Sequence, residues 1–296
     1  MEEQKQQIEA IRDYWNQRAN GFALAVDEEL KLEEAKEWER QFRENIQEPE
    51  ACVLDDGTGA GFFSVILSRL GYKVTAIDYS DEMVALAKER FKKLGISVDV
   101  RQMDAQHLTF ADASFDAVVS RNVLWNLDDP EAAYREICRV LRPRGVLILE
   151  DGNMYLYMND PEYAAWHEAQ LEKRKKEQAK ESLHGKYNVD HVDFSIIERI
   201  AGDLSISKIR RPQWDFNQLV SLGFDDIHIT TTGEKLPMGF RITARKKEVR
   251  LGEDDPEEAG VSCHYSVRPV NSDVWPDISA AVRSGRGAHH FDGWQP

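Results

Sequence analysis

One stretch of the sequence constrains the fold more than any other. An apolar segment, residues 51–54, runs directly into a turn that contains Gly57, Gly59 and Gly61, and the apolar residues 62–70 follow. Glycine suits such a turn because it adopts positive φ at low cost and lets a ligand approach the backbone. Unpaired N–H groups at the start of the next helix attract an anionic part of a ligand. The stretch therefore predicts a parallel strand, a nucleotide-binding turn and a helix.

The spacing of the glycines indicates the kind of nucleotide. A dinucleotide-binding turn follows the pattern G-x-G-x-x-G, which puts a glycine at position 62, where this sequence has Phe62. A nicotinamide-dependent dehydrogenase is therefore disfavoured. A second apolar segment, residues 73–78, ends in Asp78, a position from which a carboxylate accepts hydrogen bonds from ribose hydroxyls. Taken alone, the glycine cluster is also typical of a structural cap or bulge.

Two further pieces of sequence carry a resemblance to a known family. Residues 53–61 read V-L-D-D-G-T-G-A-G and, together with Asp78, resemble the first two motifs of the class I S-adenosylmethionine-dependent methyltransferases. Residues 140–149 read V-L-R-P-R-G-V-L-I-L and resemble a later motif of that family, with Arg144 where glycine is usual. The resemblance implies S-adenosyl-L-methionine as cofactor and S-adenosyl-L-homocysteine as product.

Strand-like and helix-like segments alternate through the first half of the chain. Apolar segments at residues 98–102, 115–121 and 145–151 alternate with helical patterns at 80–90 and 130–141. Such units build a parallel sheet with right-handed crossovers, and ligands bind outside the carboxyl ends of its strands. The resemblance implies an α/β, doubly wound, mostly parallel seven-stranded sheet of order 3-2-1-4-5-7-6 whose last strand is antiparallel.

We divide the chain into five regions. They are an N-terminal helical cap (1–47), a cofactor-binding core (48–152), a helical lid insertion (153–205), the end of the core (206–247), and an acidic linker with a C-terminal tail (248–296). The cap is expected to form two helices, 2–19 and 27–46, joined through Asn20 and Gly21. The aromatic and histidine-bearing tail is expected either to pack on its own domain or to bind a partner or metal through His289 and His290.

The resemblance also implies the residues that hold the cofactor. They are Tyr14, Arg18, Asp55, Gly57, Thr58, Gly59, Gly61, Asp78, Tyr79, Met83, Asp104, Ala105, Arg121 and Asn122. Asp104 is expected to accept a hydrogen bond from the adenine amine, or alternatively to cap the turn in which it lies. Tyr14 is expected near the methionine part of the cofactor, or alternatively, like Trp15, in the apolar stripe that packs on the core.

Aromatic residues in and near the lid insertion suggest a substrate pocket. The substrate-binding candidates are Trp15, Trp125, Tyr155, Tyr157 and Trp166. A connection as long as residues 153–205 is rarely idle, although a dimer contact is the alternative role. If the nucleophile carries a proton, His184, Tyr187 and His191 are the candidate bases.

The net charge and the end of the fourth strand indicate what kind of molecule the protein binds. A net charge of −15 disfavours nucleic acid, because proteins that bind a phosphate backbone usually carry a basic surface. The residues at the end of the fourth strand, Ser120-Arg-Asn-Val123, differ from the Asn/Asp-Pro-Pro-Tyr/Phe motif that clamps an amino group in nucleic-acid adenine and protein glutamine methyltransferases. The substrate is therefore expected to be a small molecule.

Three scattered cysteines predict reduced thiols, and no zinc-like spacing occurs in the core, so no metal is expected. Neither a signal peptide nor a membrane span is expected, which predicts a cytoplasmic protein with no membrane partner. We expect a small-molecule methyltransferase, the alternative being a non-catalytic protein that binds the same cofactor for regulation or assembly. A homodimer is an open expectation.

Overall fold

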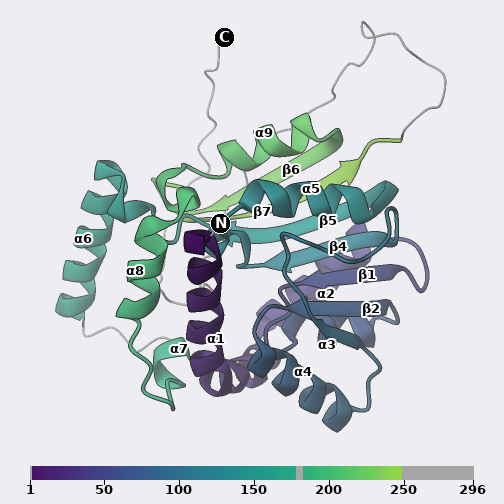
Figure 1. Cartoon of the computed structure of the whole chain (residues 1–296), viewed down its shortest axis with the longest axis horizontal. Helices are drawn as coiled ribbons and strands as arrows, with labels where there is room; N and C mark the ends of the chain where they lie inside the picture. The colour runs from purple at the N-terminus through teal and green to yellow at the C-terminus, as the bar shows by residue number, and fades with distance from the viewer. Residues whose placement is uncertain (1, 178–182, 234, 249–296) are drawn as a thin grey trace, which may run out of the picture.

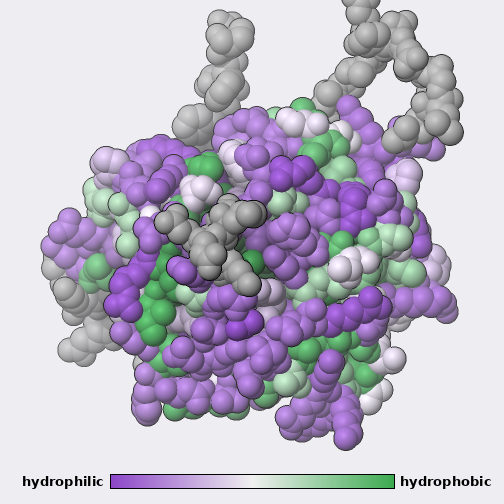
Figure 2. All heavy atoms as spheres, viewed as in Figure 1, coloured by the Kyte–Doolittle hydropathy of each residue, from purple (hydrophilic) through white to green (hydrophobic). Residues whose placement is uncertain are grey.

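The structure is a computed structural model that describes residues 2–177, 183–233 and 235–248 (Figure 1). The predictions for the linker and tail beyond residue 248, including His289 and His290, lie outside the described residues. No helix in the described part of the chain is long and apolar enough to cross a membrane. The face seen in Figure 2 is mostly hydrophilic, with apolar residues in separate groups, as the high content of charged residues leads one to expect.

A seven-stranded sheet forms the centre of the molecule, in the order β3-β2-β1-β4-β5-β7-β6. The strands are β1 (Cys52–Asp56), β2 (Lys73–Asp78), β3 (Asp99–Gln102), β4 (Phe115–Arg121), β5 (Leu141–Gly152), β6 (Phe224–Thr232) and β7 (Gly239–Lys246). The first five pair in parallel, whereas β7 runs antiparallel to both β5 and β6. The predicted fold class and strand order are confirmed.

Helices cover both faces of the sheet. On one face, α5 (Pro130–Val140) and α9 (Gln213–Ser221) bury Tyr134, Ile137 and Leu219 against β4, β5 and β6. On the other face, α2 (Glu33–Asn45) and α3 (Phe62–Arg69) bury Trp38 and Phe63 against β1 and β4. Burying side chains of this size contributes roughly 1.5–3 kcal/mol each. The strands therefore have covered faces, and the carboxyl ends of β1, β2 and β4 remain for a site.

The helix that follows β2 begins and ends at recognisable signals. In α4 (Asp81–Leu94), the Ser80 hydroxyl accepts a hydrogen bond from the backbone N–H of Met83, and Gly95 follows the helix with φ 65°. Asp81 in the first turn and Lys93 in the last turn complement the helix dipole. These local signals explain why the sequence predicted the start of this helix correctly.

The N-terminal cap differs from its prediction in one respect. A single helix, α1 (Glu2–Glu29), runs through Asn20 and Gly21, so the predicted interruption there is wrong. A Cβ placed on Gly21 would lie 2.0 Å from the backbone oxygen of Tyr187. Gly21 therefore allows a distant segment to approach the helix closely.

The chain between β5 and α9 forms a series of helices. They are η2 (Leu156–Met158), α6 (Pro161–Glu177), α7 (Leu183–Lys186), α8 (Ser195–Asp203) and η3 (Ser205–Lys208); another 3-10 helix, η1 (Leu124–Asn126), follows β4. Of the helices in the series, α7 and α8 contact α1 of the cap. Figure 1 shows α8 between α1 and α6. The apolar side chains of α8, Ile197 and Ala201, pack with Tyr14 of α1. The segment after β5 is thereby joined to the cap above the sheet edge.

A buried ion cluster fixes the end of this insertion to the sheet. Arg211 lies 3.3 Å from Asp151 at the end of β5 and 2.5 Å from Asp215 of α9. The hydroxyl of Tyr134 donates to Asp215 at 2.7 Å. Burial raises the pKa of Asp151 to about 6, and Arg211 opposes this rise. Arg211 and Asp151 therefore have a structural role, and the carboxylate of Asp151 is engaged in this cluster.

Candidate active site

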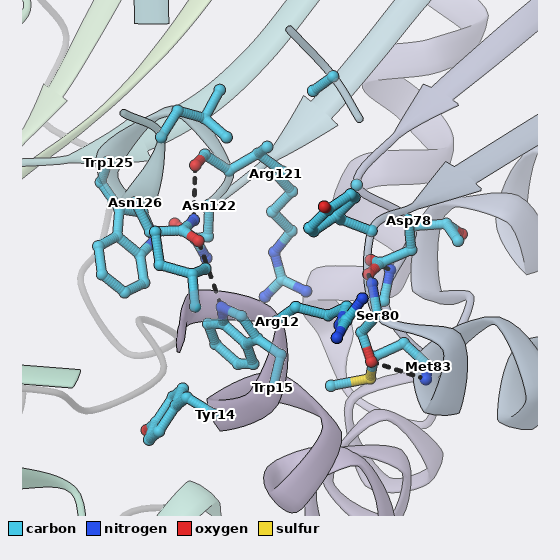
Figure 3. Close-up of a pocket in the computed structure, with 18 of the residues that line it drawn as sticks. Arg12, Tyr14, Trp15, Asp78, Ser80, Met83, Arg121, Asn122, Trp125 and Asn126 are labelled. Atoms are coloured by element: carbon cyan, nitrogen blue, oxygen red, sulfur yellow. Dashed lines mark hydrogen bonds between the residues drawn. The ribbon is translucent and has the colours of Figure 1, made fainter. Parts of the chain in front are cut away.

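A pocket of about 290 Å³ lies at the carboxyl edge of the sheet, between the ends of β1, β2 and β4 and the helices α1 and α8. In Figure 3, Asp78, Ser80 and Met83 lie on one side of it, and Trp125 with Asn126 on the other. Residues of α1 face the space between them. The pocket therefore occupies the place at which parallel α/β sheets bind their ligands.

The glycine turn after β1 forms one wall. Gly57 and Gly59 have φ values of 77° and 52°, and a Cβ on Gly57 would lie 2.1 Å from a methyl group of Val123. Backbone N–H groups of Gly57 and Thr58 donate to the carbonyl of Ile77 at 3.0 and 2.8 Å. Position 57 thus requires glycine both for its backbone conformation and for its close contact with the chain after β4.

Asp78 joins the glycine turn to the start of α4. Its carboxylate accepts hydrogen bonds from the backbone N–H groups of Gly59, at 2.8 Å, and Ser80, at 2.9 Å. Burial raises the pKa of Asp78 to about 6, while these hydrogen bonds oppose the rise. A carboxylate oxygen has further lone pairs, so Asp78 can still accept from a ribose hydroxyl.

Asp55, at the end of β1, stabilises the glycine turn through hydrogen bonds. Its carboxylate accepts hydrogen bonds from the hydroxyls of Thr58 and Ser64, both at 2.6 Å. Burial raises the pKa of Asp55 to about 6, and the two hydroxyls oppose this. Asp55 therefore fastens the turn to the first residues of α3.

Asp56 is a pocket residue that the sequence analysis missed. It is 1% exposed, and its Oδ1 atom has no hydrogen-bond partner among the described residues. Burial raises the pKa of Asp56 to about 7, and the charges of Asp55, Asp104 and Asp78 add to the effect. An unpaired buried acceptor is costly, by about 1–3 kcal/mol, unless a ligand supplies its partner. The signal available in the sequence was the second acid directly before Gly57.

The end of β4 contributes a charged and a polar group. Arg121 makes ion pairs with Glu29 of α1 at 2.9 Å and with Glu150 of β5 at 3.2 Å, and its guanidinium lies 4.5 Å from the ring centre of Phe62. Asn122 adopts φ 58°, and its buried Oδ1 atom has no partner within the described part of the chain. A non-glycine residue held in this region often marks a functional position.

Other parts of α1 hold it over the pocket. Asn16 accepts a hydrogen bond from Ser80 at 2.6 Å and donates to Asp81 at 2.9 Å. Glu9 accepts from the Tyr79 hydroxyl at 3.0 Å. These bonds connect the cap with the start of α4, next to the ribose position expected for Asp78.

Asp104 lies in the turn after β3, where it stabilises the turn and also lines the pocket. Its carboxylate accepts from the backbone and side-chain N–H groups of Gln106 at 2.9 and 3.1 Å. Both of its expected roles, a turn cap and a pocket residue, are therefore compatible with the geometry.

The opposite end of the pocket is aromatic. The ring centres of Tyr14 and Trp15 are 5.3 Å apart, those of Trp15 and Trp125 are 6.3 Å apart, and those of Trp125 and Tyr155 are 5.4 Å apart. The indole N–H of Trp15 donates to Asn126 at 3.2 Å (Figure 3). These rings come from α1, η1 and the segment after β5, so distant parts of the sequence form one apolar wall.

Most of the expected cofactor and substrate residues line this pocket. Those that do are Tyr14, Trp15, Arg18, Asp55, Gly57, Thr58, Gly59, Asp78, Tyr79, Met83, Asp104, Ala105, Arg121, Asn122, Trp125 and Tyr155. Gly61, Tyr157 and Trp166 do not. Gly61 instead lies against Phe91, whose ring is 2.6 Å from the place of a Cβ there.

The three candidate bases are not brought to the pocket. Tyr187 contacts Lys186 and Gly21, and His191 is exposed with φ 51°. His184 lies in α7, and its side chain is outside the described part of the structure. None of the three lines the pocket, so its geometry gives them no support.

Several other pocket residues escaped the sequence analysis. They include Arg12, Phe22, Glu29, Asn126, Phe194 and Glu198. Arg12 and Phe22 lie on the same face of a helix as Trp15, three residues before it and seven after it. Extending the face of Trp15 in both directions would therefore have predicted these two residues. Phe194 and Glu198 carry no such signal, because they lie in and beside a short helix whose orientation depends on tertiary packing.

Comparison with known proteins supports the class of protein. Residues 54–149 match a family described as a methyltransferase domain. Over 100 residues the chain is 37% identical to an uncharacterized methyltransferase, YodH, of Bacillus subtilis, covering 34% of this chain and 42% of that protein. Over 104 residues it is 39% identical to the ubiquinone biosynthesis O-methyltransferase of Xanthomonas axonopodis pv. citri, covering 35% of this chain and 44% of that protein. The chain thus matches less than half the length of these relatives.

Solved structures were also compared. Magnesium protoporphyrin IX methyltransferase (ChlM) from Synechocystis PCC 6803, solved with bound SAH, matches with a TM-score of 0.48 and 16% identity over 73% of this chain and 82% of that chain. A SAM-dependent methyltransferase from Aquifex aeolicus matches with a TM-score of 0.45 and 20% identity over 70% of this chain and 88% of that chain.

Residues 54–149 therefore form a methyltransferase domain, and the strand order of the sheet is the one implied by the resemblance to the class I S-adenosylmethionine-dependent methyltransferases. The cofactor of this family is S-adenosyl-L-methionine. The pocket fits its chemistry, because the unpaired acceptors of Asp56 and Asn122 suit the ammonium, amine and hydroxyl donors of this molecule. Among the residues described, no group of three or more His, Cys, Asp or Glu side chains is arranged to hold a metal.

Proposed function

We propose that this chain is an S-adenosylmethionine-dependent methyltransferase that acts on an oxygen, nitrogen or sulfur nucleophile of a small molecule. One observation carries the proposal: the glycine turn with Asp78 and the aromatic wall of Tyr14, Trp125 and Tyr155 line the same pocket. A nucleotide-binding end and an apolar end in one cavity are what a two-substrate transfer requires.

The residues near β2 and β3 have roles in this proposal that follow from their chemistry. Asp78 holds the ribose hydroxyls, Asp104 accepts from the adenine amine, and the backbone around Gly57 and Gly59 leaves room for the nucleoside. Asp56 and Asn122 take the ammonium group, and Arg18 the carboxylate, of the methionine part. The bound cofactor supplies a methyl group on a sulfonium centre, and the leaving thioether is neutral.

The contribution of the protein is then to align the acceptor and to exclude water. Tyr14, Trp125 and Tyr155 are each at most 4% exposed, so an acceptor bound against this wall would be shielded from water on that side. Holding two reactants in place can account for about 7–11 kcal/mol of barrier in favourable cases. The proposal therefore needs no metal from this chain.

The experiment that tests the proposal has two stages. Isothermal titration with S-adenosyl-L-methionine and S-adenosyl-L-homocysteine comes first, and a metabolite-library screen for release of S-adenosyl-L-homocysteine follows. Failure to bind either compound contradicts the proposal. Binding without release for any acceptor favours the non-catalytic alternative.

Two further expectations from the sequence belong to this proposal. We propose that the protein acts in the cytoplasm and that the insertion, residues 153–205, closes over a bound acceptor. The alternative role of that insertion is to form the contact between the two subunits of a homodimer. Light scattering coupled to size-exclusion chromatography measures the mass and decides whether a dimer forms.

A further inference from the structure

The pocket has an end that the cofactor does not account for. We define the acceptor end as Tyr14, Trp125, Met154, Tyr155, Ile197 and Glu198, all of which line the pocket. The first five also pack together as one apolar cluster. Figure 3 shows Tyr14 and Trp125 on the side of the pocket away from Asp78. The chemistry of this end therefore determines which acceptor binds.

The aromatic rings at this end pack against one another at steep angles along the pocket wall. The ring planes of Trp125 and Tyr155 are inclined at 45°, and those of Trp15 and Trp125 at 67°. Rings at such angles form adjoining walls and do not stack face to face. The face of an aromatic ring attracts a cation, and the attraction reaches about 2 kcal/mol when the site is desolvated.

One carboxylate belongs to the acceptor end. Glu198 is an exposed residue that lines the pocket, and among the described residues its side chain has neither a hydrogen-bond partner nor an ion-pair partner. Burial raises the pKa of Tyr14 to about 12 and also raises that of Tyr155, and the negative charge of Glu198 raises both further. Glu198 therefore lies near two neutral hydroxyls at physiological pH.

Arg18 also lines the pocket, and the proposed function assigns it to the carboxylate of the cofactor. Arg18 donates to the side-chain oxygen of Asn188 at 3.0 Å, and its guanidinium lies 4.7 Å from the ring centre of Phe194. Arg18 is 3% exposed. These contacts hold Arg18 to Asn188 and Phe194, and no ion pair joins it to Glu198 in the described part of the chain.

We propose that the acceptor is an amine that binds in its ammonium form, held by the carboxylate of Glu198 and the rings of Tyr14, Trp125 and Tyr155. The inference rests on the proposed function and narrows its substrate class. A carboxylate with surrounding aromatic faces favours a cation over a neutral molecule of the same shape and repels an anion. An amine has this chemistry. Once its ammonium form has given a proton to water, its lone pair can form the N–C bond to the methyl carbon while the C–S bond of the sulfonium breaks, which leaves a methylated ammonium and a neutral thioether.

The test uses a matched pair of probes on the full chain saturated with S-adenosyl-L-homocysteine. Choline carries a quaternary ammonium that has no lone pair, so its binding is independent of turnover. Its uncharged carbon isostere, 3,3-dimethyl-1-butanol, has the same shape. Isothermal titration is expected to show choline binding at least about tenfold more tightly than the isostere.

The variant Glu198→Gln isolates the carboxylate. Choline affinity is expected to fall about two- to fivefold, since an ion pair at an exposed carboxylate becomes a neutral contact, while affinity for S-adenosyl-L-homocysteine stays unchanged. The control Glu168→Gln makes the same charge change at an exposed residue of α6 that does not line the pocket. This control is expected to leave both affinities as in the parent protein.

The outcomes separate the two proposals. No binding of S-adenosyl-L-homocysteine contradicts the proposed function itself. If that compound binds but choline shows no preference over its isostere, or Glu198→Gln changes nothing, the ammonium proposal is overturned and the proposed function stands. If S-adenosyl-L-homocysteine instead displaces choline, the cation binds in the cofactor site, and the ammonium proposal is likewise overturned.

Discussion

The carboxylate of Asp78 accepts a hydrogen bond from the backbone N–H of Gly59 at 2.8 Å, although the two residues belong to different strand ends. This bond joins the tip of the glycine turn to the end of β2. Any group that binds Asp78 therefore also meets the turn, which explains why the two sequence motifs belong to one site.

Replacing Asp78 with alanine is expected to weaken binding of S-adenosyl-L-methionine by roughly tenfold or more, because hydrogen bonds to a charged group contribute about 1.5–3 kcal/mol. Isothermal titration measures the loss. Since Asp78 also binds Gly59 and Ser80, circular dichroism and the melting temperature must accompany the titration. Asp99→Ala, at an exposed acid of β3, is the control, and unaltered binding in Asp78→Ala would argue against the ribose role.

Gly57→Ala is expected to lower both stability and cofactor affinity. A Cβ there meets Val123 at 2.1 Å and φ is 77°, so the free energy of unfolding should fall by roughly 2–4 kcal/mol. Gly95→Ala is the matched control, because Gly95 has φ 65° with nothing within 4 Å of its Cβ position. The control should lose about 1 kcal/mol and keep its affinity. Urea denaturation and titration measure the two effects, and equal losses in both variants would show that the contact with Val123 is unimportant.

The buried carboxylates of the pocket predict a dependence on pH. The pKa values of Asp55 and Asp78 are raised to about 6 and that of Asp56 to about 7, chiefly by burial. Because a raised pKa in the folded protein favours the protonated form, these groups stabilise the protein at low pH. That stabilisation is lost as pH rises through about 6 to 7.

The ligand-free protein is therefore expected to lose stability through these groups between about pH 4, the unfolded pKa of an aspartate, and about pH 7, whereas the cationic cofactor should bind more tightly as they ionise. Thermal melts with and without S-adenosyl-L-methionine across this range measure both trends. Asp56→Asn should flatten the loss of stability in the ligand-free protein. A slope unchanged by this variant would show that Asp56 does not titrate in this range.

Disrupting the ion cluster around Arg211 is expected to lower the stability of the protein strongly. Arg211→Met leaves the carboxylates of Asp151 and Asp215 buried without their counterion, so the free energy of unfolding should fall by about 3–5 kcal/mol. Tyr134→Phe removes one hydrogen bond to Asp215 and should cost about 1 kcal/mol. Urea denaturation compares them, and a smaller loss for Arg211→Met than for Tyr134→Phe would contradict the cluster's role.

The sequence predicted the sheet well because its signals are local. Strands β2 and β4 have the predicted bounds, Lys73–Asp78 and Phe115–Arg121, since each is a short apolar run between clear turn residues. The glycine turn and Asp78 are likewise recognisable from spacing alone.

What could not be predicted depends on contacts between distant segments. The sequence around Gly21 predicts a helix break, because the approach of Tyr187 to this residue depends on the folded structure. Glu198 is an exposed acid, and it lines the pocket only because α8 packs beside Tyr14. The candidate bases failed to reach the pocket for the same reason, because nothing in the residues around His191 specifies the direction in which that loop turns.

The contact at Gly21 bears on how selective the protein can be. The segment that touches it continues to Asn188, which holds Arg18, and to Phe194 at the pocket. A side chain at position 21 would push this segment outward, and the mouth of the cavity would widen although no residue touching a ligand had changed. One missing carbon atom thus limits the size of the molecules admitted, and enlarging residue 21 offers a means of broadening the range of acceptors.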